Sequence, residues 1–203
     1  STTTESVQSL EKHLSSVMSE MRVLQKKYSR MEKKAREDQL TGLLNRSALQ
    51  TSFTSLTTNE NINQVTMVVA DIDHFKSFND QHGHSIGDKV IKLVADTLKS
   101  NLKGSDVVSR YGGEEFVILL PNTTINNAMQ LMNTIRKKIS TLSFINRATD
   151  KKIDGITMSF GIAESDDTDN FHSIFDRADK ALYRSKQNGR NRVHAEYKTE
   201  GKN

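Results

Sequence analysis

Two pairs of carboxylates are the residues of this sequence most suited to chemistry. Asp71 and Asp73 end an apolar run that begins "QVTMVVAD", and Glu114 and Glu115 follow two glycines in "RYGGEEFVILLP". Like charges side by side repel, and burying either one costs free energy. Taken alone, each pair is more often a solvated strand end or turn than a functional site.

The flanking residues place these acids at the ends of buried strands. Residues 64–71 and 116–120 have the composition of buried strands. Gly112-Gly113 predicts a tight hairpin turn, because glycine adopts positive φ without steric cost. A central strand beside this hairpin could bring Asp71 and Glu114 to one sheet edge. Converging carboxylates favour Mg²⁺, which keeps phosphate and water in its other positions, as in nucleotidyl transfer.

Basic residues that could hold phosphates lie in two places. Lys76 follows Asp71 by five positions, and "RSKQNGRNR" carries Lys186 and Arg190 at a predicted helix end. Basic residues are common at helix C-termini because the helix dipole stabilises them, so this cluster alone decides little. The turn "DIDHF" also offers backbone N–H groups that can cradle an anion.

Asn79 and Asp88 enclose a polar segment that has two interpretations. An amide and a carboxylate can read a purine edge, the carboxylate accepting from an amino group as in guanine. From the residues alone, turn and N-cap chemistry is the preferred interpretation. His82 and His84 have no third strong ligand nearby in the sequence, so a structural role is favoured over zinc.

Composition sets the broad class of protein. The chain has 203 residues, of which 34% are hydrophobic and 27% charged, which is typical of a polar but folded domain with an appendage. No apolar run approaches the ~18 residues of a membrane span. Cysteine is absent, which excludes disulfides and thiol catalysis. The net charge of +4 suits an anionic small ligand as well as nucleic acid.

Periodicity predicts an α+β sandwich in which helices pack against a mixed sheet. Helices and strands alternate, with one hairpin in the middle. The expected helices span residues 47–56, 84–102, 125–142 and 171–187, the last stopped by Gly189. The expected strands span residues 64–71, 107–111, 116–120, 156–163 and 192–197.

The N-terminal segment has a different rhythm. Its apolar residues are spaced alternately by three and four positions, which is the a/d pattern of a two-stranded coiled coil. A single amphipathic helix lying on the globular domain is the alternative. These apolar positions are Val7, Leu10, Leu14, Val17, Met21, Leu24, Tyr28 and Met31; Ala35 continues the pattern and Asp38 ends it.

Four motifs, in order and spacing, resemble those of the GGDEF family in its GGEEF form. They are "DQLTGLLNR" (38–46), "DIDHFKSFNDQHGHSIGD" (71–88), "RYGGEEF" (110–116) and "ALYRSKQNGRN" (181–191). The resemblance covers about residues 38–197. It implies a palm-like fold related to adenylyl cyclases, preceded by a long helix. The implied activity is that of a diguanylate cyclase, which condenses two GTP into cyclic di-GMP and releases two pyrophosphates.

The resemblance also assigns roles to residues. Asp71, Glu114 and the main-chain carbonyl of Ile72 would bind two Mg²⁺ ions per half-site, with Mn²⁺ as an alternative ion. Glu114 would also lie near the attacking ribose hydroxyl, and Glu115 would support it. Asn79 and Asp88 match the guanine-reading pair, and Gly112 and Gly113 leave room for the nucleotide. The triphosphate contacts would be Lys76, Lys186, Arg190 and the main-chain amides of His74 and Phe75.

One position departs from the family pattern. Many members carry an Arg-x-x-Asp product-inhibition site before the signature, whereas this chain has Lys103 with Asp106 in "KGSD". Lysine lacks the planar fork of arginine. We expect high-affinity product inhibition through this site to be absent or weak.

These patterns give an expected organisation. Residues 1–37 would form a coiled-coil dimerisation linker, 38–197 the cyclase domain and 198–203 a tail. The sequence begins at Ser1 without a signal-like segment, so we expect a fragment of a longer protein. The heptad helix is expected to be the end of a linker from a missing N-terminal sensor. We also expect a cytoplasmic domain and no nucleic-acid partner. The full-length protein could be membrane-anchored elsewhere. The alternatives are a silent domain that only binds GTP or cyclic di-GMP, and a coiled-coil scaffold.

Overall fold

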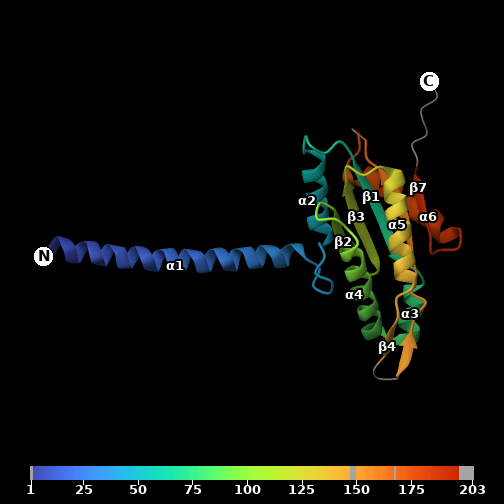
Figure 1. The fold of residues 1–203 in the computed structure, drawn as a ribbon, viewed down its shortest axis with the longest axis horizontal. Helices are drawn as coiled ribbons and strands as arrows, with labels where there is room; N and C mark the ends of the chain where they lie inside the picture. The colour runs from blue at the N-terminus through green and yellow to red at the C-terminus, as the bar shows by residue number, and fades with distance from the viewer. Residues whose placement is uncertain (1, 147–149, 167, 197–203) are drawn as a thin grey trace. The chain divides into compact units, whose positions relative to one another are not determined.

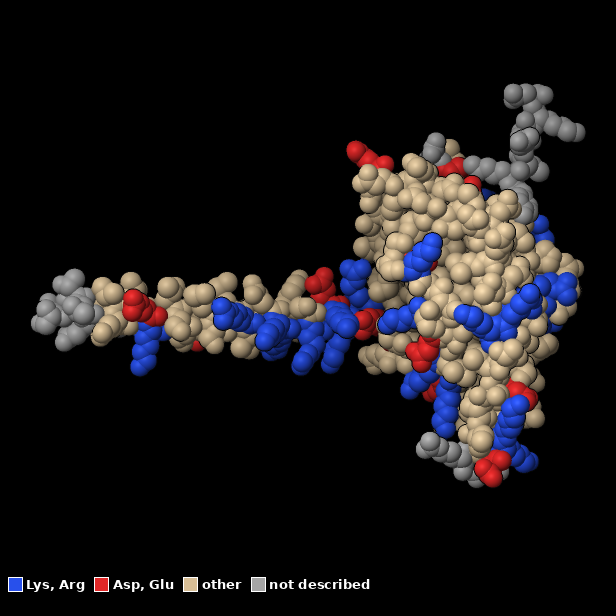
Figure 2. All heavy atoms as spheres, viewed as in Figure 1, with Lys and Arg blue, Asp and Glu red and all other residues tan. Residues whose placement is uncertain are grey.

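The computed structural model describes residues 2–146, 150–166 and 168–196, and it divides the chain into two compact units at Glu37 and Asp38. The predicted tail, 198–203, and Tyr197 lie outside the described residues. The first unit is one helix, α1 (Thr2–Arg36). Its apolar heptad positions are 43–70% exposed, and Figure 2 shows the basic side chains of α1 gathered in its C-terminal half.

The second unit is built on a five-stranded mixed sheet in the order β2-β3-β1-β6-β7. Among the named strands that the structure describes, β6 and β7 pair in parallel, and the other neighbours in this sheet pair antiparallel. The strands are β1 (Val65–Ile72), β2 (Val107–Arg110), β3 (Glu115–Pro121), β6 (Met158–Glu164) and β7 (Val193–Glu196). A separate two-stranded ladder joins β4 (Phe144–Asn146) to β5 (Lys151–Ile153).

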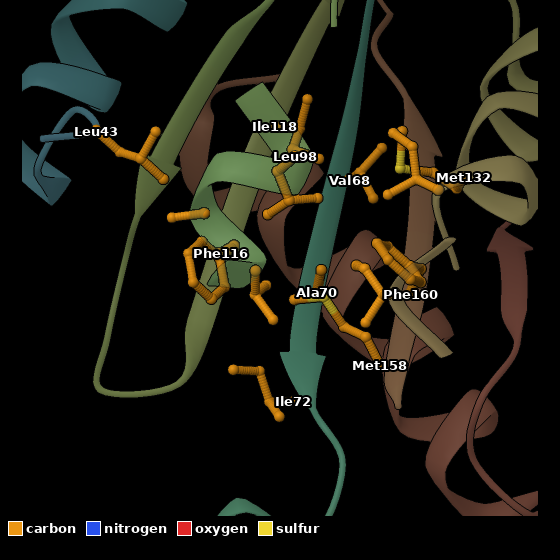
Figure 3. Close-up of a cluster of buried hydrophobic side chains, with 14 of the residues drawn as sticks. Leu43, Val68, Ala70, Ile72, Leu98, Phe116, Ile118, Met132, Met158 and Phe160 are labelled. Atoms are coloured by element: carbon orange, nitrogen blue, oxygen red, sulfur yellow. The ribbon is translucent and has the colours of Figure 1, made fainter. Parts of the chain in front are cut away.

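Helices cover both faces of the sheet (Figure 1). The α4 and α5 face packs on alternate strand residues such as Val68, Phe116 and Phe160 (Figure 3), and the α2 and α6 face packs on the residues between them. The helices are α2 (Arg46–Thr57), α3 (Phe75–His82), α4 (His84–Ser100), α5 (Ile125–Ser140) and α6 (Phe171–Gln187). Every residue of β1 is therefore buried.

Gly161 lets α6 approach the sheet at backbone distance. A Cβ built on Gly161 would lie 2.1 Å from the carbonyl oxygen of Ala178 and 2.1 Å from the amide nitrogen of Leu182. Real side chains never come this close, so any other residue would push α6 away from β6. The position of the C-terminal end of α6 therefore depends on this glycine.

The α+β fold class is confirmed, and the expected helices and strands form with small shifts at their ends. Two features were not predicted from sequence, namely α3 and the β4–β5 ladder. One prediction was wrong. Gly112 and Gly113 are not among the residues with positive φ. The chain turns instead over residues 111–114, where the amides of Tyr111 and Gly112 both donate to the carbonyl of Glu115.

Candidate active site

Three carboxylates meet where β1 ends beside the start of β3. Asp71 is only 6% exposed, and Glu114 and Glu115 are half-buried. Asp71 lies opposite Glu115 in the strand register, and the amide of Ile72 donates to the carbonyl of Glu114 at 3.2 Å. The antiparallel pairing thus brings the two predicted acidic segments together.

This clustering disfavours ionisation of all three acids. Burial raises the pKa of Asp71, and the neighbouring Lys186 offsets this only in part. Burial and the charge of Asp71 raise the pKa values of Glu114 and Glu115. The edge therefore carries more negative charge than the surrounding protein compensates, which is a common property of functional sites.

The C-terminal end of α6 supplies the nearest cation. Lys186 Nζ lies 3.0 Å from Asp71 Oδ1, and Arg190 also acts electrostatically on Asp71. The helix ends at a run of three positive-φ residues, Gly189 (φ 105°), Arg190 (φ 61°) and Asn191 (φ 44°). Left-handed backbone at consecutive non-glycine residues is strained, and such strain concentrates at functional sites.

Asp73 fixes this strained loop through three hydrogen bonds, and its charge also contributes to the raised pKa of Asp71. Its Oδ2 accepts from Thr157 Oγ1 at 2.8 Å and from the amide of Asn191 at 2.9 Å. Its Oδ1 accepts from Ser159 Oγ at 2.7 Å. The two aspartates of "DID" therefore differ in function, since Asp71 faces the acids whereas Asp73 is saturated with hydrogen bonds.

Arg110 braces the glycine turn, a role that was not assigned from sequence. Its Nε and Nη2 donate to the carbonyl of Gly113 at 3.1 and 2.7 Å, and its Nη1 contacts both carboxylate oxygens of Asp38 at 3.3 Å. Burial opposes ionisation of Asp38, but hydrogen bonds from Thr41 and the charge of Arg110 outweigh it and lower its pKa. Asp38 and Arg110 each begin one of the four family motifs, so their place in these motifs was the signal by which the sequence could have indicated this contact.

Each glycine of the turn has a different neighbourhood. A Cβ on Gly112 would lie 2.5 Å from Glu115 Oε2, whereas one on Gly113 would meet nothing within 4 Å. Gly112 thus makes room for the Glu115 carboxylate, and Gly113 leaves open space at the surface.

The remaining predicted residues lie around α3 and the start of α4. His74 has φ 57° and precedes α3, whose first turn has no side-chain cap. Lys76 is exposed near this N-terminus, where backbone N–H groups have no partner within the helix. Asn79 is half-buried on α3 and Asp88 is exposed on α4. The two side chains thus come from neighbouring helices, and a shared role for them is a proposal.

The donor set at the acidic edge suits a hard divalent cation. Among the described residues, no three His, Asp or Glu side chains form a group that could hold a metal by themselves. Asp71, Glu114 and the carbonyl of Ile72 instead offer two carboxylates and one main-chain oxygen. Oxygen-only ligands with room for phosphate and water are what Mg²⁺ prefers.

Lys103 and Asp106 close a turn beside a cavity. Asp106 Oδ2 accepts from the amide of Lys103 at 2.8 Å, and the amide of Asp106 donates back to the Lys103 carbonyl at 3.0 Å. The cavity has a volume of about 390 Å³, and its lining includes Lys99, Leu102 and Val108.

In the part of the chain that the structure describes, no helix is long and apolar enough to cross a membrane.

Comparison with known proteins adds independent observations. The family described as "Diguanylate cyclase, GGDEF domain" matches residues 35–192. Diguanylate cyclase VdcA of Vibrio cholerae is 36% identical over 185 residues, and Diguanylate cyclase DgcP of Pseudomonas aeruginosa is 40% identical over 162. The matches cover 91% and 79% of this chain but only 54% and 24% of those proteins.

A solved structure matches both units of the chain. It is the coiled coil and GGDEF domain of DgcB from Caulobacter crescentus in complex with c-di-GMP. It has a TM-score of 0.86 and 34% identity, and the match covers 93% of this chain and all of that one. The sheet, the signature hairpin and these matches lead to one conclusion: the chain belongs to the GGDEF family of diguanylate cyclases.

Proposed function

We propose that this chain is a catalytically competent diguanylate cyclase domain, which joins two GTP molecules into cyclic di-GMP and releases two pyrophosphates. The observation that carries the proposal is the acidic edge of Asp71, Glu114 and Glu115 with Lys186 beside it. Structural ion pairs usually balance their charges, whereas the three acids here keep raised pKa values although Lys186, Arg190 and Arg46 act on them, which indicates an excess of negative charge. The excess suits a bound cation and a phosphorylated substrate.

Asp71, Glu114 and the Ile72 carbonyl would hold the divalent metal that this family requires; we propose Mg²⁺, two per half-site, with Mn²⁺ as an alternative. When bound, the metal neutralises charge on the phosphate oxygens. Glu114 is also the group proposed to lie at the attacking ribose 3′-hydroxyl. The pKa of Glu114 is raised, so its carboxylate accepts a proton more readily than a glutamate in water, which suits a general base.

Cations and backbone donors on two sides would hold the triphosphate. Lys186 and Arg190 approach from the end of α6, and Lys76 lies at the N-terminus of α3. The amides of His74 and Phe75 begin that helix, where the dipole favours anions. Catalysis then consists of holding the α-phosphate in line with the incoming hydroxyl and stabilising the charge that develops.

Asn79 and Asp88 are proposed to read guanine, and the glycine turn is proposed to lie against the nucleotide. The Asp88 carboxylate can accept from the N1–H and the amino group of guanine, which adenine does not present in this pattern. Gly113 supports this placement because open space surrounds the position of its missing side chain.

The product is a symmetric dinucleotide, so two domains must face each other. We propose that α1 dimerises as a coiled coil and raises the effective concentration of the second half-site. Its apolar heptad positions are exposed in the single chain, as expected for a seam that a second copy covers. We also propose that a sensor domain precedes α1 in the full-length protein and that the cyclase domain is cytoplasmic.

The activity is tested by incubating the full chain with GTP and Mg²⁺ and detecting cyclic di-GMP by chromatography. We expect product from the wild type, none from Glu114→Gln, and wild-type rates from Glu60→Gln, a matched change at an exposed glutamate away from the acidic edge. GTP binding without product in the dimeric wild type would identify a silent binding module and overturn the proposal.

The coiled coil is tested with adjacent residues on α1. Leu24 occupies a heptad position and is 66% exposed, whereas Val23 beside it is off the seam and 65% exposed. Leu24→Asn should lower activity per chain at dilution and shift the mass measured by light scattering toward the monomer. Val23→Asn should do neither. Equal effects of the two changes would exclude this seam.

We also propose that product inhibition through the Lys103–Asp106 turn is weak. Lysine cannot grip a base and a phosphate together as a guanidinium can. Calorimetric titration of cyclic di-GMP should show no sub-micromolar binding. Tight binding that disappears in Asp106→Asn would contradict this expectation.

A further inference from the structure

We propose that Gly87 is a specificity-determining residue of the nucleotide site, which acts by giving the Asn79 amide its place between α3 and α4. This inference rests on the proposed role of Asn79 in reading guanine. Gly87 itself contacts no substrate in this account, so it is a positioning residue.

The contact between the two residues is close. A Cβ built on Gly87 would lie 1.9 Å from Asn79 Oδ1 and 3.0 Å from Asn79 Cγ. It would also lie 3.1 Å from Phe75 Cζ, on a ring that is 5% exposed. The Asn79 amide therefore occupies the volume that a side chain at position 87 would need.

Helix formation gives no reason for a glycine at this position. Gly87 lies inside α4 and is not among the residues with positive φ, so its backbone accepts alanine. Glycine inside a helix costs roughly 0.5–1 kcal/mol relative to alanine. The local structure thus favours alanine, and the benefit of glycine must come from the side chain packed against it.

The Asn79 amide is also unsatisfied in its present position. Its Oδ1 is buried and has no hydrogen-bond partner among the described residues. An unpaired buried acceptor costs about 1–3 kcal/mol. The fold therefore retains two unfavourable features at one contact, a helical glycine and an unpaired amide oxygen. A fixed orientation of the Asn79 side chain toward a ligand explains both.

The connection between α3 and α4 makes this orientation rigid. Only Gly83, with φ 82°, separates the two helices. The amide of Gly83 donates to the Asn79 carbonyl at 2.7 Å, and the amide of Gly87 donates to the Gly83 carbonyl at 3.1 Å. Main-chain hydrogen bonds thus tie positions 79 and 87 together through the corner. A methyl group at 87 would have to displace the Asn79 side chain and not the helices.

A double-mutant cycle on the full chain tests the inference with Gly87→Ala, Asn79→Ala and both changes together. The readouts are KM and kcat for GTP, the ratio of kcat/KM for GTP to that for ITP, which lacks the 2-amino group, and the melting temperature without nucleotide. We expect Gly87→Ala to raise the KM for GTP about tenfold, to leave kcat within about threefold, and to lower the GTP-to-ITP ratio.

The Asn79→Ala background is the matched control, because the methyl group then has no amide to displace. There, Gly87→Ala should leave KM and the GTP-to-ITP ratio unchanged. If Gly87→Ala alone fails to fold but the double variant folds, that rescue supports the same contact. An unchanged KM in Gly87→Ala, or the same rise in both backgrounds, would overturn the inference. An unchanged KM in Asn79→Ala would instead reject the proposed guanine role of Asn79, and the inference with it.

Discussion

Asp71 and Asp73 are separated by one residue, yet their removal should change stability in opposite directions. Asp73 accepts three hydrogen bonds in a buried position, from Thr157, Ser159 and the amide of Asn191. Asp71 lies beside two further acids whose pKa values are raised by burial and by the charge of Asp71. Loss of the first carboxylate leaves donors unpaired, whereas loss of the second relieves repulsion.

The magnitude for Asp73→Ala follows from its partners. A hydrogen bond to a charged group contributes about 1.5–3 kcal/mol net, but the two hydroxyl donors can turn to other acceptors, so the three bonds do not simply add. We expect Asp73→Ala to lower the free energy of unfolding by about 4 kcal/mol. For a domain of this size, the melting temperature should fall by about 8–16 °C.

The asparagine variants make the comparison sharper, because both preserve side-chain shape. In Asp73→Asn, the amide oxygen can keep two of the bonds and Ser159 can rotate to accept from the new NH₂, so the loss should be about 1–2 kcal/mol. Asp71→Asn should melt at or above the wild-type temperature in metal-free buffer while losing cyclase activity. Calorimetry without metal or nucleotide measures both. If Asp71→Asn destabilises the fold as much as Asp73→Ala, the assignment of separate roles is wrong.

Four further outcomes follow from the geometry. The acids at the site edge bind protons more tightly in the folded state than in the unfolded state. The stability they contribute is therefore present below pH ~4 and is lost as pH rises through their raised pKa values. In metal-free buffer, the melting temperature should fall with rising pH less steeply in Asp71→Asn than in wild type. Arg110→Lys should reduce kcat about tenfold or more with a small loss of stability, because an ammonium cannot serve the Gly113 carbonyl and Asp38 together; kinetics and melting measured side by side would refute this if kcat were unchanged. Gly161→Ala should destabilise the fold and lower GTP affinity, because a Cβ would collide with the backbone of α6. Ser109→Ala should be neutral or stabilising in urea unfolding, because the Ser109 hydroxyl is buried without a partner among the described residues.

The sequence predicted the strands and long helices well because their patterns are strong. The period-3.6 apolar stripe of α4 and the apolar run of β1 leave little ambiguity, and both form close to the expected bounds. In contrast, α3 has one buried residue in eight, Phe75, so no apolar periodicity marks it. The β4–β5 ladder is short and largely exposed, which removes the same signal.

The site was predicted less completely, for a different physical reason. Residue type and motif identified Asp71, Glu114 and Lys186, and the structure brings them together. The supporting contacts of Asp73, Arg110 and Gly161 join segments far apart in the sequence. No local pattern shows that a carboxylate will receive three donors or that a glycine will face a helix backbone. The positive φ expected at Gly112 and Gly113 was wrong because the chain turns over residues 111–114 without it, and Gly112 instead makes room for the Glu115 carboxylate.

The long-range bond at Asp73 has a consequence for how the protein is made. The amide of Asn191 reaches a carboxylate 118 positions earlier in the chain. A ribosome therefore completes Asp71, Glu114 and Glu115 well before it adds the residues that hold the loop of Lys186 and Arg190. Chains released early carry the acids without the end of α6 that is proposed to bind phosphate, so truncated synthesis products should be unable to make the proposed product.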